Sequence, residues 1–390
     1  MQNFEFVSPT QFVFGRGVEE QVGQKLAAAG AKSCLLHFGG QSAVKSGLID
    51  RIRASLDAAG IAYVELGGVR PNPEISLVRQ GVRLCKERGL DWVLAVGGGS
   101  VIDSAKAIAN GACIDEDVWT LFETKRVDHE VLPIAVVLTI PAAGSEASKN
   151  TVISNDELGR KTGYANNAHR PRLAFMNPEL TYTLPEYQTA AGCTDMFAHL
   201  LERFFDNCEP VPVTDNLNLS LMKTVRTFAP VVLEEPENYE ARANIMWAGM
   251  LCHQGLAGVG RVEDWATHGL EHELSALKPE ITHGAGLAVL FPAWMEYVHE
   301  LNPGRFAQYG YEVFGVAPSG DVLLDAQAAI DQTRMFFASL GMPTTLEELN
   351  VEEADIESMI PTLKANKGEP FGSFMRLTMD DARQIYRLAL

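Results

Sequence analysis

The sequence predicts two domains, an α/β amino-terminal domain with a doubly wound parallel sheet and an all-α carboxy-terminal domain. Two patterns predict this fold class. Short β-branched runs alternate with helical stretches as far as about residue 178, and the strand signals stop beyond Leu184-Pro185. In addition, a chain of 390 residues exceeds what one ordinary hydrophobic core supports.

The strands of the predicted sheet come from the first part of the chain. Four runs have the length and the β-branched, apolar composition of buried strands, at 33–38, 62–66, 92–96 and 134–138. Two segments between the first three runs, 45–59 and 74–88, have apolar residues at spacings of three and four, as helices do. This alternation is typical of a parallel sheet covered by helices, as in Rossmann-like folds.

In the second part of the chain, the residue pattern predicts helices at 187–205, 215–228, 239–255, 264–277 and 286–299, with several more before the carboxyl end. We place the domain boundary at Pro185, because a helix can begin at a proline but cannot run through it easily. The expected domains are residues 1–184 and 185–390. No repeat or low-complexity linker separates them, so we expect tight packing with the active site in the cleft between them.

Charge and hydropathy exclude several classes of partner. Lys and Arg number 32 against 50 Asp and Glu, and the net charge of -18 repels nucleic-acid backbones and anionic lipid. The amino end has no basic segment followed by an apolar run, and the longest apolar stretch, 131–140, is too short to span a bilayer. We therefore expect a cytoplasmic protein without a nucleic-acid or membrane partner.

A glycine turn follows the predicted strand at 92–96. Gly97, Gly98 and Gly99 precede Ser100 and a predicted helix at 101–110. Backbone without side chains lets a pyrophosphate approach the free N–H groups at a helix N-terminus. Three successive glycines differ from the G-x-G-x-x-G pattern and can also form a simple tight turn. The position between strand and helix favours binding of a dinucleotide.

A second glycine turn, Gly39-Gly40-Gln41-Ser42, follows the first predicted strand, where the adenosine ribose lies in such folds. No Asp or Glu stands in this turn to bind a ribose 2′-hydroxyl, whereas Ser42 and Lys45 can meet a 2′-phosphate. The turn therefore favours NADP(H) over NAD(H).

Metal-binding residue types recur at helical spacing in the carboxy-terminal part. Asp195 and His199 are four residues apart and share one helix face, and His268 and His272 repeat this spacing. A single pair of this kind is more often part of a core or a surface than a metal site. Two pairs together with His283 favour a site where one carboxylate and three imidazoles bind Fe²⁺, Zn²⁺ or a similar divalent ion.

Five segments form a specific combination, namely Pro9-Thr10-Gln11-Phe12-Val13-Phe14-Gly15, Pro71-Asn72-Pro73, the run from Leu94 to Lys106 with its three glycines, Ala142-Ala143-Gly144-Ser145-Glu146 and the run from Ala266 to Leu274. With these segments, and over nearly its whole length, the chain resembles the iron-containing (group III) alcohol dehydrogenases. It resembles most their branch of butanol dehydrogenases and broad aldehyde reductases.

The resemblance implies a set of functional residues. The metal ligands are Asp195, His199, His268 and His283, in agreement with the spacing argument. The resemblance also implies that Trp265 lines the alcohol pocket, although packing in a core explains an aromatic residue at this position equally well. The turn at Gly39 lacks the aspartate of NAD-specific relatives. The cofactor-binding residues are Gly97, Gly98, Gly99 and Ser100 at the pyrophosphate, Asp103 and Asn72 along the nucleotide cleft, Thr139 and Lys161 at its far end, and Gly39, Gly40 and Ser42 at the ribose.

The reaction implied by the resemblance is hydride transfer between nicotinamide C4 and a small alcohol or aldehyde, with the metal as Lewis acid on its oxygen. We expect His272, one helical turn after His268, to relay the proton. An equally open role for His272 is to orient a metal ligand. The family also implies a homodimer or a higher homo-oligomer.

Other function classes compete with this hypothesis. An enzyme similar to dehydroquinate synthase or glycerol-phosphate dehydrogenase acts on a phosphorylated substrate, which calls for basic residues near the metal, where the sequence offers only Arg261 and Lys278. A metal-dependent hydrolase leaves both glycine turns without a purpose. A binding protein with a structural metal is disfavoured, because structural sites rarely leave room for a substrate.

Overall fold

The computed structural model describes residues 1–142, 144–206 and 210–390. The chain forms two compact units. Residues Val7–Thr183 form an α/β unit, and Leu184–Leu390 together with Met1–Phe6 form a helical unit. The first six residues group with the helical unit, where the Gln2 N–H donates to the Gly260 carbonyl at 2.8 Å.

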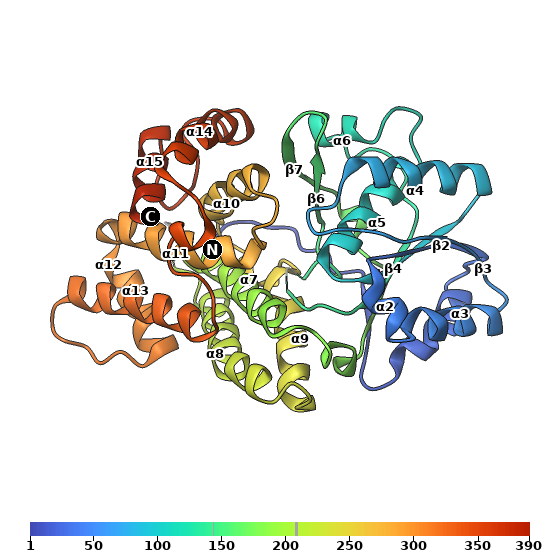
Figure 1. The fold of residues 1–390 in the computed structure, drawn as a ribbon. Helices are drawn as coiled ribbons and strands as arrows, with labels where there is room; N and C mark the ends of the chain where they lie inside the picture. The colour runs from blue at the N-terminus through green and yellow to red at the C-terminus, as the bar shows by residue number, and fades with distance from the viewer. Residues whose placement is uncertain (143, 207–209) are drawn as a thin grey trace. The chain divides into compact units, whose positions relative to one another are not determined.

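The α/β unit, blue to green in Figure 1, contains eight strands and six α-helices among its described residues. In chain order they are β1 (Gln11–Phe14), α1 (Val22–Ala28), β2 (Ser33–Phe38), α2 (Gln41–Lys45), α3 (Leu48–Ala58), β3 (Ala62–Leu66), α4 (Ile75–Arg88), β4 (Trp92–Gly97), α5 (Gly99–Gly111), α6 (Trp119–Thr124), β5 (Ile134–Leu138), β6 (Asn150–Asn155), β7 (Arg160–Ala165) and β8 (Leu173–Met176).

Six of these strands form one parallel sheet in the order β1-β8-β5-β4-β2-β3. The four strands that the sequence predicts are confirmed as β2 to β5. Strands β1 and β8 were not predicted, because each has only four residues, too few to show a period. The parallel, doubly wound class is confirmed.

Helices cover both faces of the sheet, as Figure 1 shows for α3 below and α4 above strands β2 to β4. On one face, apolar residues of α1 and α3 such as Leu26 and Ile52 pack with Leu36 and Leu94 of the sheet. On the other face, α5 packs on β4 and α4 packs on α5. Strand β4 is buried throughout, as a central parallel strand covered on both faces must be.

Two local features of the α/β unit correct the sequence prediction. The expected helix at 45–59 begins only at Leu48, as α3, because Gly47 adopts a left-handed conformation at φ 72° that separates it from α2, a short helix that the sequence did not predict. Strands β6 and β7, which were not predicted, pair antiparallel as a hairpin. Their sequences are largely polar, and only the alternating burial of β6 shows the strand period.

The helical unit, green to red in Figure 1, contains no strand within the residues described. Its α-helices are α7 (Glu186–Phe204), α8 (Pro212–Glu234), α9 (Tyr239–His253), α10 (Ala266–Leu277), α11 (His283–Val298), α12 (Pro303–Tyr309), α13 (Val322–Ser339), α14 (Glu353–Lys367) and α15 (Met379–Leu388), with a π-helical segment, η6 (Gly310–Phe314). The five predicted helices are confirmed as α7 to α11. Helix α8 continues past Pro230, and its buried Ala229 and Val232 keep both sides of the proline in the core.

A single apolar core holds the helical unit together. It contains residues from all of its α-helices, and Phe205 stacks on Phe306 with 4.3 Å between ring centroids. Helix α11 packs against both α7 and α10 within this core, which fixes the places of the side chains on the contacting faces. In the part of the chain described, no helix has both the length and the apolar composition needed to cross a bilayer.

Candidate metal centre and dinucleotide turn

Three helices of the helical unit carry the predicted metal ligands. Helix α7 carries Asp195 and His199, α10 carries His268, and His283 is the first residue of α11. Because α11 packs against both α7 and α10, residues up to 88 positions apart in the sequence meet at one point. The first three side chains are buried, and His283 is half-buried.

The four predicted ligands lie close together. Potential donor atoms of Asp195, His199 and His268 all lie within 4.8 Å of one another. Oδ1 of Asp195 is 3.1 Å from Nδ1 of His199 and 3.8 Å from Nε2 of His283. The ring of His268 stands between two others, with centroids 4.6 Å from His199 and 5.3 Å from His283.

The state of His268 fits a metal ligand. Its Nδ1 hydrogen-bonds Oε1 of Glu202 at 2.8 Å, while its buried Nε2 has no hydrogen-bond partner among the residues described. Burial, and then the neighbouring His199 and His283, hold the pKa of His268 well below its usual range, so the ring is neutral and Nε2 keeps its lone pair. A buried carboxylate with neutral imidazoles is the donor set that Fe²⁺ and Zn²⁺ accept.

His272 lies at the edge of this cluster. It is half-buried, and its ring centroid is 6.5 Å from that of His268 and 5.6 Å from that of His283. Atoms of Glu271, His272 and His283 form a second group within 4.8 Å. The partial exposure of His272 allows its ring to exchange a proton with solvent, which the buried His268 cannot do as readily.

Two residues that contact the histidine cluster, His253 and Glu202, are not predicted from the sequence. The ring of His253 packs 4.4 Å from that of His199, and its Nδ1 accepts a hydrogen bond from Arg203 at 2.8 Å. The sequence does not indicate His253, because no helical spacing relates it to His199. Nor does spacing connect Glu202 with His268, which are 66 residues apart.

Trp265 packs against the histidine cluster. Its ring centroid is 4.9 Å from that of His268, and its indole N–H donates to Glu263 at 2.6 Å. The residue adopts a left-handed backbone at φ 62° immediately before α10, and the Arg203 guanidinium lies 4.7 Å from the centre of its ring. Strain of this kind in a tryptophan persists only where surrounding contacts impose it.

The predicted glycine turns lie next to each other in the α/β unit. Phe38 at the end of β2 is paired with Val96 of β4, and Gly97 is paired with Leu138 of β5. Gly39, Gly97 and Thr139 therefore lie at the carboxyl edge of three adjacent parallel strands, the edge at which such sheets bind ligands. The Thr139 N–H donates to the Gly97 carbonyl at 3.1 Å.

The first two glycines of the turn after β4 are needed for packing, and the third leaves space open. A Cβ on Gly98 would lie 2.9 Å from Cβ of Ile140, whereas a Cβ on Gly99 would meet nothing within 4 Å. Gly98 is extended and Gly99 begins α5, with no side chain capping the free N–H groups of this helix end. An anion at this turn is thus free to approach backbone donors.

Asp103 has partners within the protein. Its carboxylate accepts the Ser145 hydroxyl at 2.6 Å and the Val152 N–H at 2.8 Å, so it fastens the segment after β5 to α5. Burial raises its pKa, while Lys106, first among the opposing effects, and Lys161 on β7 lower it. The other predicted cofactor residues of this unit, Asn72 and Ser42, lie beyond β3 and at the start of α2, and Asn72 has a left-handed backbone at φ 57°.

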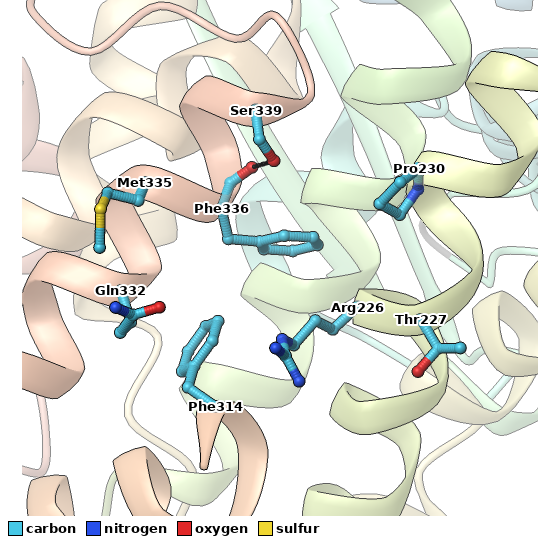
Figure 2. A pocket seen from close by; sticks show the side chains of 8 residues that line it. All are labelled: Arg226, Thr227, Pro230, Phe314, Gln332, Met335, Phe336 and Ser339. Carbon is cyan, nitrogen blue, oxygen red and sulfur yellow. Dashed lines mark hydrogen bonds between the residues drawn. The ribbon is translucent and has the colours of Figure 1, made fainter. Parts of the chain in front are cut away.

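A separate pocket of about 570 Å³ lies among α8, η6 and α13. Figure 2 shows the Arg226 guanidinium beside the Phe314 ring in this pocket, at 5.4 Å. None of the predicted site residues lines it, and we do not assign it to the site. Its lining residues are Arg226, Thr227, Pro230, Phe314, Gln332, Met335, Phe336 and Ser339.

Comparison with known proteins agrees with this arrangement. The family model for iron-containing alcohol dehydrogenase matches residues 9–178, and that for the C-terminal part of the Fe-containing alcohol dehydrogenase family matches residues 189–390. The chain is 39% identical to a probable NADH-dependent butanol dehydrogenase of Bacillus subtilis, with full coverage of both chains. It is 34% identical to the NADPH-dependent aldehyde reductase YqhD of Escherichia coli, again over the full length of both.

The fold has close counterparts among solved structures. The structure of NADH-dependent butanol dehydrogenase A from Thermotoga maritima superimposes with a TM-score of 0.96 at 37% identity, covering 100% of this chain and 99% of that one. Two family models spanning almost the whole chain and full-length relatives above 30% identity agree with each other. The chain belongs to the iron-containing alcohol dehydrogenase family, within its branch of butanol dehydrogenases and aldehyde reductases.

Proposed function

We propose that this enzyme is a metal-dependent, NAD(P)-linked alcohol dehydrogenase and aldehyde reductase that moves hydride between nicotinamide C4 and a small alcohol or aldehyde. A single observation carries the proposal, namely the buried Nε2 of His268, which has no hydrogen-bond partner among the described residues. Potential ligand atoms of Asp195, His199 and His268 all lie within 4.8 Å of one another. Full-length relatives named as butanol dehydrogenases and as an aldehyde reductase support the substrate class.

The metal site of the proposal consists of Asp195, His199, His268 and His283. One carboxylate and three imidazoles suit Fe²⁺, the ion of the family's name, and also Zn²⁺. When bound, the ion supplies Lewis acidity toward the substrate oxygen, and the dinucleotide supplies or accepts the hydride. The buried carboxylate of Asp195 offsets part of the charge of such an ion in the apolar core.

His272 is the proposed proton carrier. Its ring stands at the edge of the cluster, on the same face of α10 as His268 and half exposed to solvent. We propose that its imidazole gives a proton to the substrate oxygen in reduction and takes one in oxidation. The alternative, an orienting contact to His283, predicts that a His272 variant loses metal affinity as well as turnover.

The dinucleotide side of the proposal rests on the two glycine turns. Gly97 to Ser100 bind the pyrophosphate at the start of α5, with Asp103, Asn72, Thr139 and Lys161 along the rest of the cofactor. Gly39, Gly40 and Ser42 face the adenosine ribose. We favour NADP(H) over NAD(H), because no carboxylate stands in this turn, while relatives with either preference occur.

A phosphorylated substrate is disfavoured by the pairing of Arg261 and Lys278, the two cations that the sequence places near the metal ligands. Arg261 is bound to Asp206 at 3.1 Å and to Asp215 at 2.5 Å, and Lys278 is bound to Asp355 at 3.0 Å. Because carboxylates already neutralise these two cations, they attract a phosphate only weakly. We further propose a cytoplasmic homodimer or higher homo-oligomer, for which light scattering that shows a monomer would be the contrary result.

The decisive experiment measures oxidation of NADPH and of NADH with butanal as substrate. It uses protein stripped of metal, protein reloaded with Fe²⁺ or Zn²⁺, and the His268→Ala variant. Activity that requires both the ion and His268 supports the reductase. Tight dinucleotide binding without turnover of any short aldehyde contradicts the proposed substrate class, and failure to bind either dinucleotide favours a metal-dependent hydrolase.

A further inference from the structure

All three histidines of the proposed metal site have Nδ1 engaged by an oxygen. Nδ1 of His199 hydrogen-bonds the backbone carbonyl of Asp195 at 2.8 Å. Nδ1 of His268 hydrogen-bonds Oε1 of Glu202 at 2.8 Å, and Nδ1 of His283 contacts Oε2 of Glu271. The acceptor oxygens require the proton on Nδ1 of His199 and of His268, and the carboxylate of Glu271 favours it on Nδ1 of His283, which leaves Nε2 of each ring as the atom able to bind an ion.

Glu202 does more than accept one hydrogen bond. Its Oε1 also accepts the backbone N–H of His268 at 2.8 Å, and its Oε2 accepts the N–H of Trp265 at 2.6 Å. Trp265, the residue before α10, contributes no side-chain cap to this helix. The carboxylate of Glu202 on α7 therefore caps α10 from outside, and the same group sets the direction of the His268 ring.

Glu271 has a similar place at the other end of the cluster. It is fully buried on α10, with Oε1 accepting the Ser275 hydroxyl one helical turn further on and Oε2 in contact with His283. The bond to Ser275 fixes the rotation of the carboxylate. Nε2 of His283 then points toward Asp195, 3.8 Å from its Oδ1.

We propose that Glu202 and Glu271 are positioning residues of the metal centre, which hold His268 and His283 with the proton on Nδ1 and with Nε2 directed to the ion. This inference rests on the proposed metal site. Carboxylates behind histidine ligands raise the basicity of the ligand and lower the entropy lost on binding, and their removal costs about tenfold to a hundredfold in metal affinity. No spacing in the sequence connects either pair.

The test measures the affinity of metal-free, full-length protein for Zn²⁺ in competition with a chromophoric chelator. The variants are Glu202→Gln and Glu271→Gln, which keep the size and one acceptor oxygen but replace the second oxygen with an NH₂ group that only donates. The matched control is Glu273→Gln, because Glu273 is also buried on α10 but accepts its hydrogen bond from Asn366 at 2.8 Å. We expect a loss of about tenfold to a hundredfold in the first two variants and none in the control.

A second measurement separates positioning from simple stabilisation. Long-range ¹⁵N correlation spectra of metal-free protein report which ring nitrogen carries the proton, and loss of a signal in His268→Ala assigns that residue. We expect Nδ1–H at His268 in the wild type and a mixture of tautomers in Glu202→Gln. If Glu202→Gln does not fold, the same measurement is made on Glu271→Gln. This variant should fold, because its amide can still form hydrogen bonds with both Ser275 and His283.

Each outcome decides between the proposals. Wild-type affinity in both variants overturns the positioning role and leaves the metal site intact. Equal losses in all three variants, including the control, overturn it in favour of general destabilisation. A wild type that binds no Zn²⁺ or Fe²⁺ overturns the proposed metal site itself, and the inference with it.

Discussion

The carboxylate of Asp103 accepts the hydroxyl of Ser145 at 2.6 Å, across 42 residues of sequence. The buried Lys106, one helical turn further on, donates to the same hydroxyl at 2.8 Å and to the carbonyl of Asn150 at 2.8 Å. Two charged residues of α5 thus hold the segment between β5 and β6 in place. Helix α5, which begins at the glycine turn proposed for the dinucleotide, thus also anchors the loop that follows β5.

Asp103→Ala removes this anchor. It leaves the Val152 N–H and the Ser145 hydroxyl without their acceptor, which costs on the order of 1–3 kcal/mol for such partly buried donors. We expect a lower melting temperature and faster amide hydrogen exchange at residues 145–152. The control is Asp57→Ala on the exposed side of α3. A variant that loses cofactor affinity with unchanged stability and exchange would contradict the anchoring role.

The buried carboxyl group of Glu146 should make the free energy of unfolding depend on pH. Burial raises its pKa to about 7 from the ordinary value of 4.5, so the folded protein holds a proton that the unfolded chain releases between these two values. The stabilisation that this proton gives the folded protein is complete below about pH 4.5 and is lost as the pH rises through about 7. Glu146→Gln is neutral at every pH. Its stability relative to wild type should therefore rise by on the order of 3 kcal/mol between about pH 4.5 and 8.

The measurement for Glu146 is the thermal unfolding of both proteins across this range. The difference between variant and wild type reports the titration of Glu146 together with its charge interaction with Lys106, whose pKa burial lowers to about 8. A difference that stays constant with pH would show that Glu146 is ionised in the folded protein over the whole range.

Gly98 and Gly99 should respond differently to alanine. Gly98→Ala places a Cβ 2.9 Å from Cβ of Ile140, and we expect it to lower the stability by about 1–3 kcal/mol. Gly99→Ala meets nothing within 4 Å and stands in the first turn of α5, so the fold should keep its stability. If the pyrophosphate lies on this turn, Gly99→Ala weakens NADPH binding, measured by fluorescence titration. Unchanged NADPH affinity in this stable variant would remove the turn from the cofactor site.

The cofactor preference can be tested at the other glycine turn. A Cβ on Gly39 would be in ordinary contact, 3.6 Å from Val101, so Gly39→Asp fits without strain. Its carboxylate should repel a 2′-phosphate and bind a ribose 2′-hydroxyl, which shifts kcat/KM toward NADH by about tenfold or more. Gly40→Ala, where space is open, is the uncharged control. A wild type that already prefers NADH would show that the absence of a carboxylate does not set the preference.

The sequence determines the features that depend on neighbours along the chain. The strands β2 to β5 follow from short β-branched runs, and the i,i+4 pairs Asp195/His199 and His268/His272 share a face because of the helical repeat alone. The glycine turn after β4 is visible for the same reason, since strand, turn and helix are contiguous. These features are enough to predict the fold class, which is confirmed, and to propose the metal ligands.

Only the tertiary structure decides which distant residues meet. The four-residue strands β1 and β8 become strands because pairing places them beside β5, and no local period shows this. Glu202 reaches His268, and His253 packs on His199, because α7, α9 and α10 contribute to one common core. A local pattern follows from backbone geometry, which is the same in every protein. The partner of a buried imidazole instead depends on how helices far apart in sequence fill a common volume.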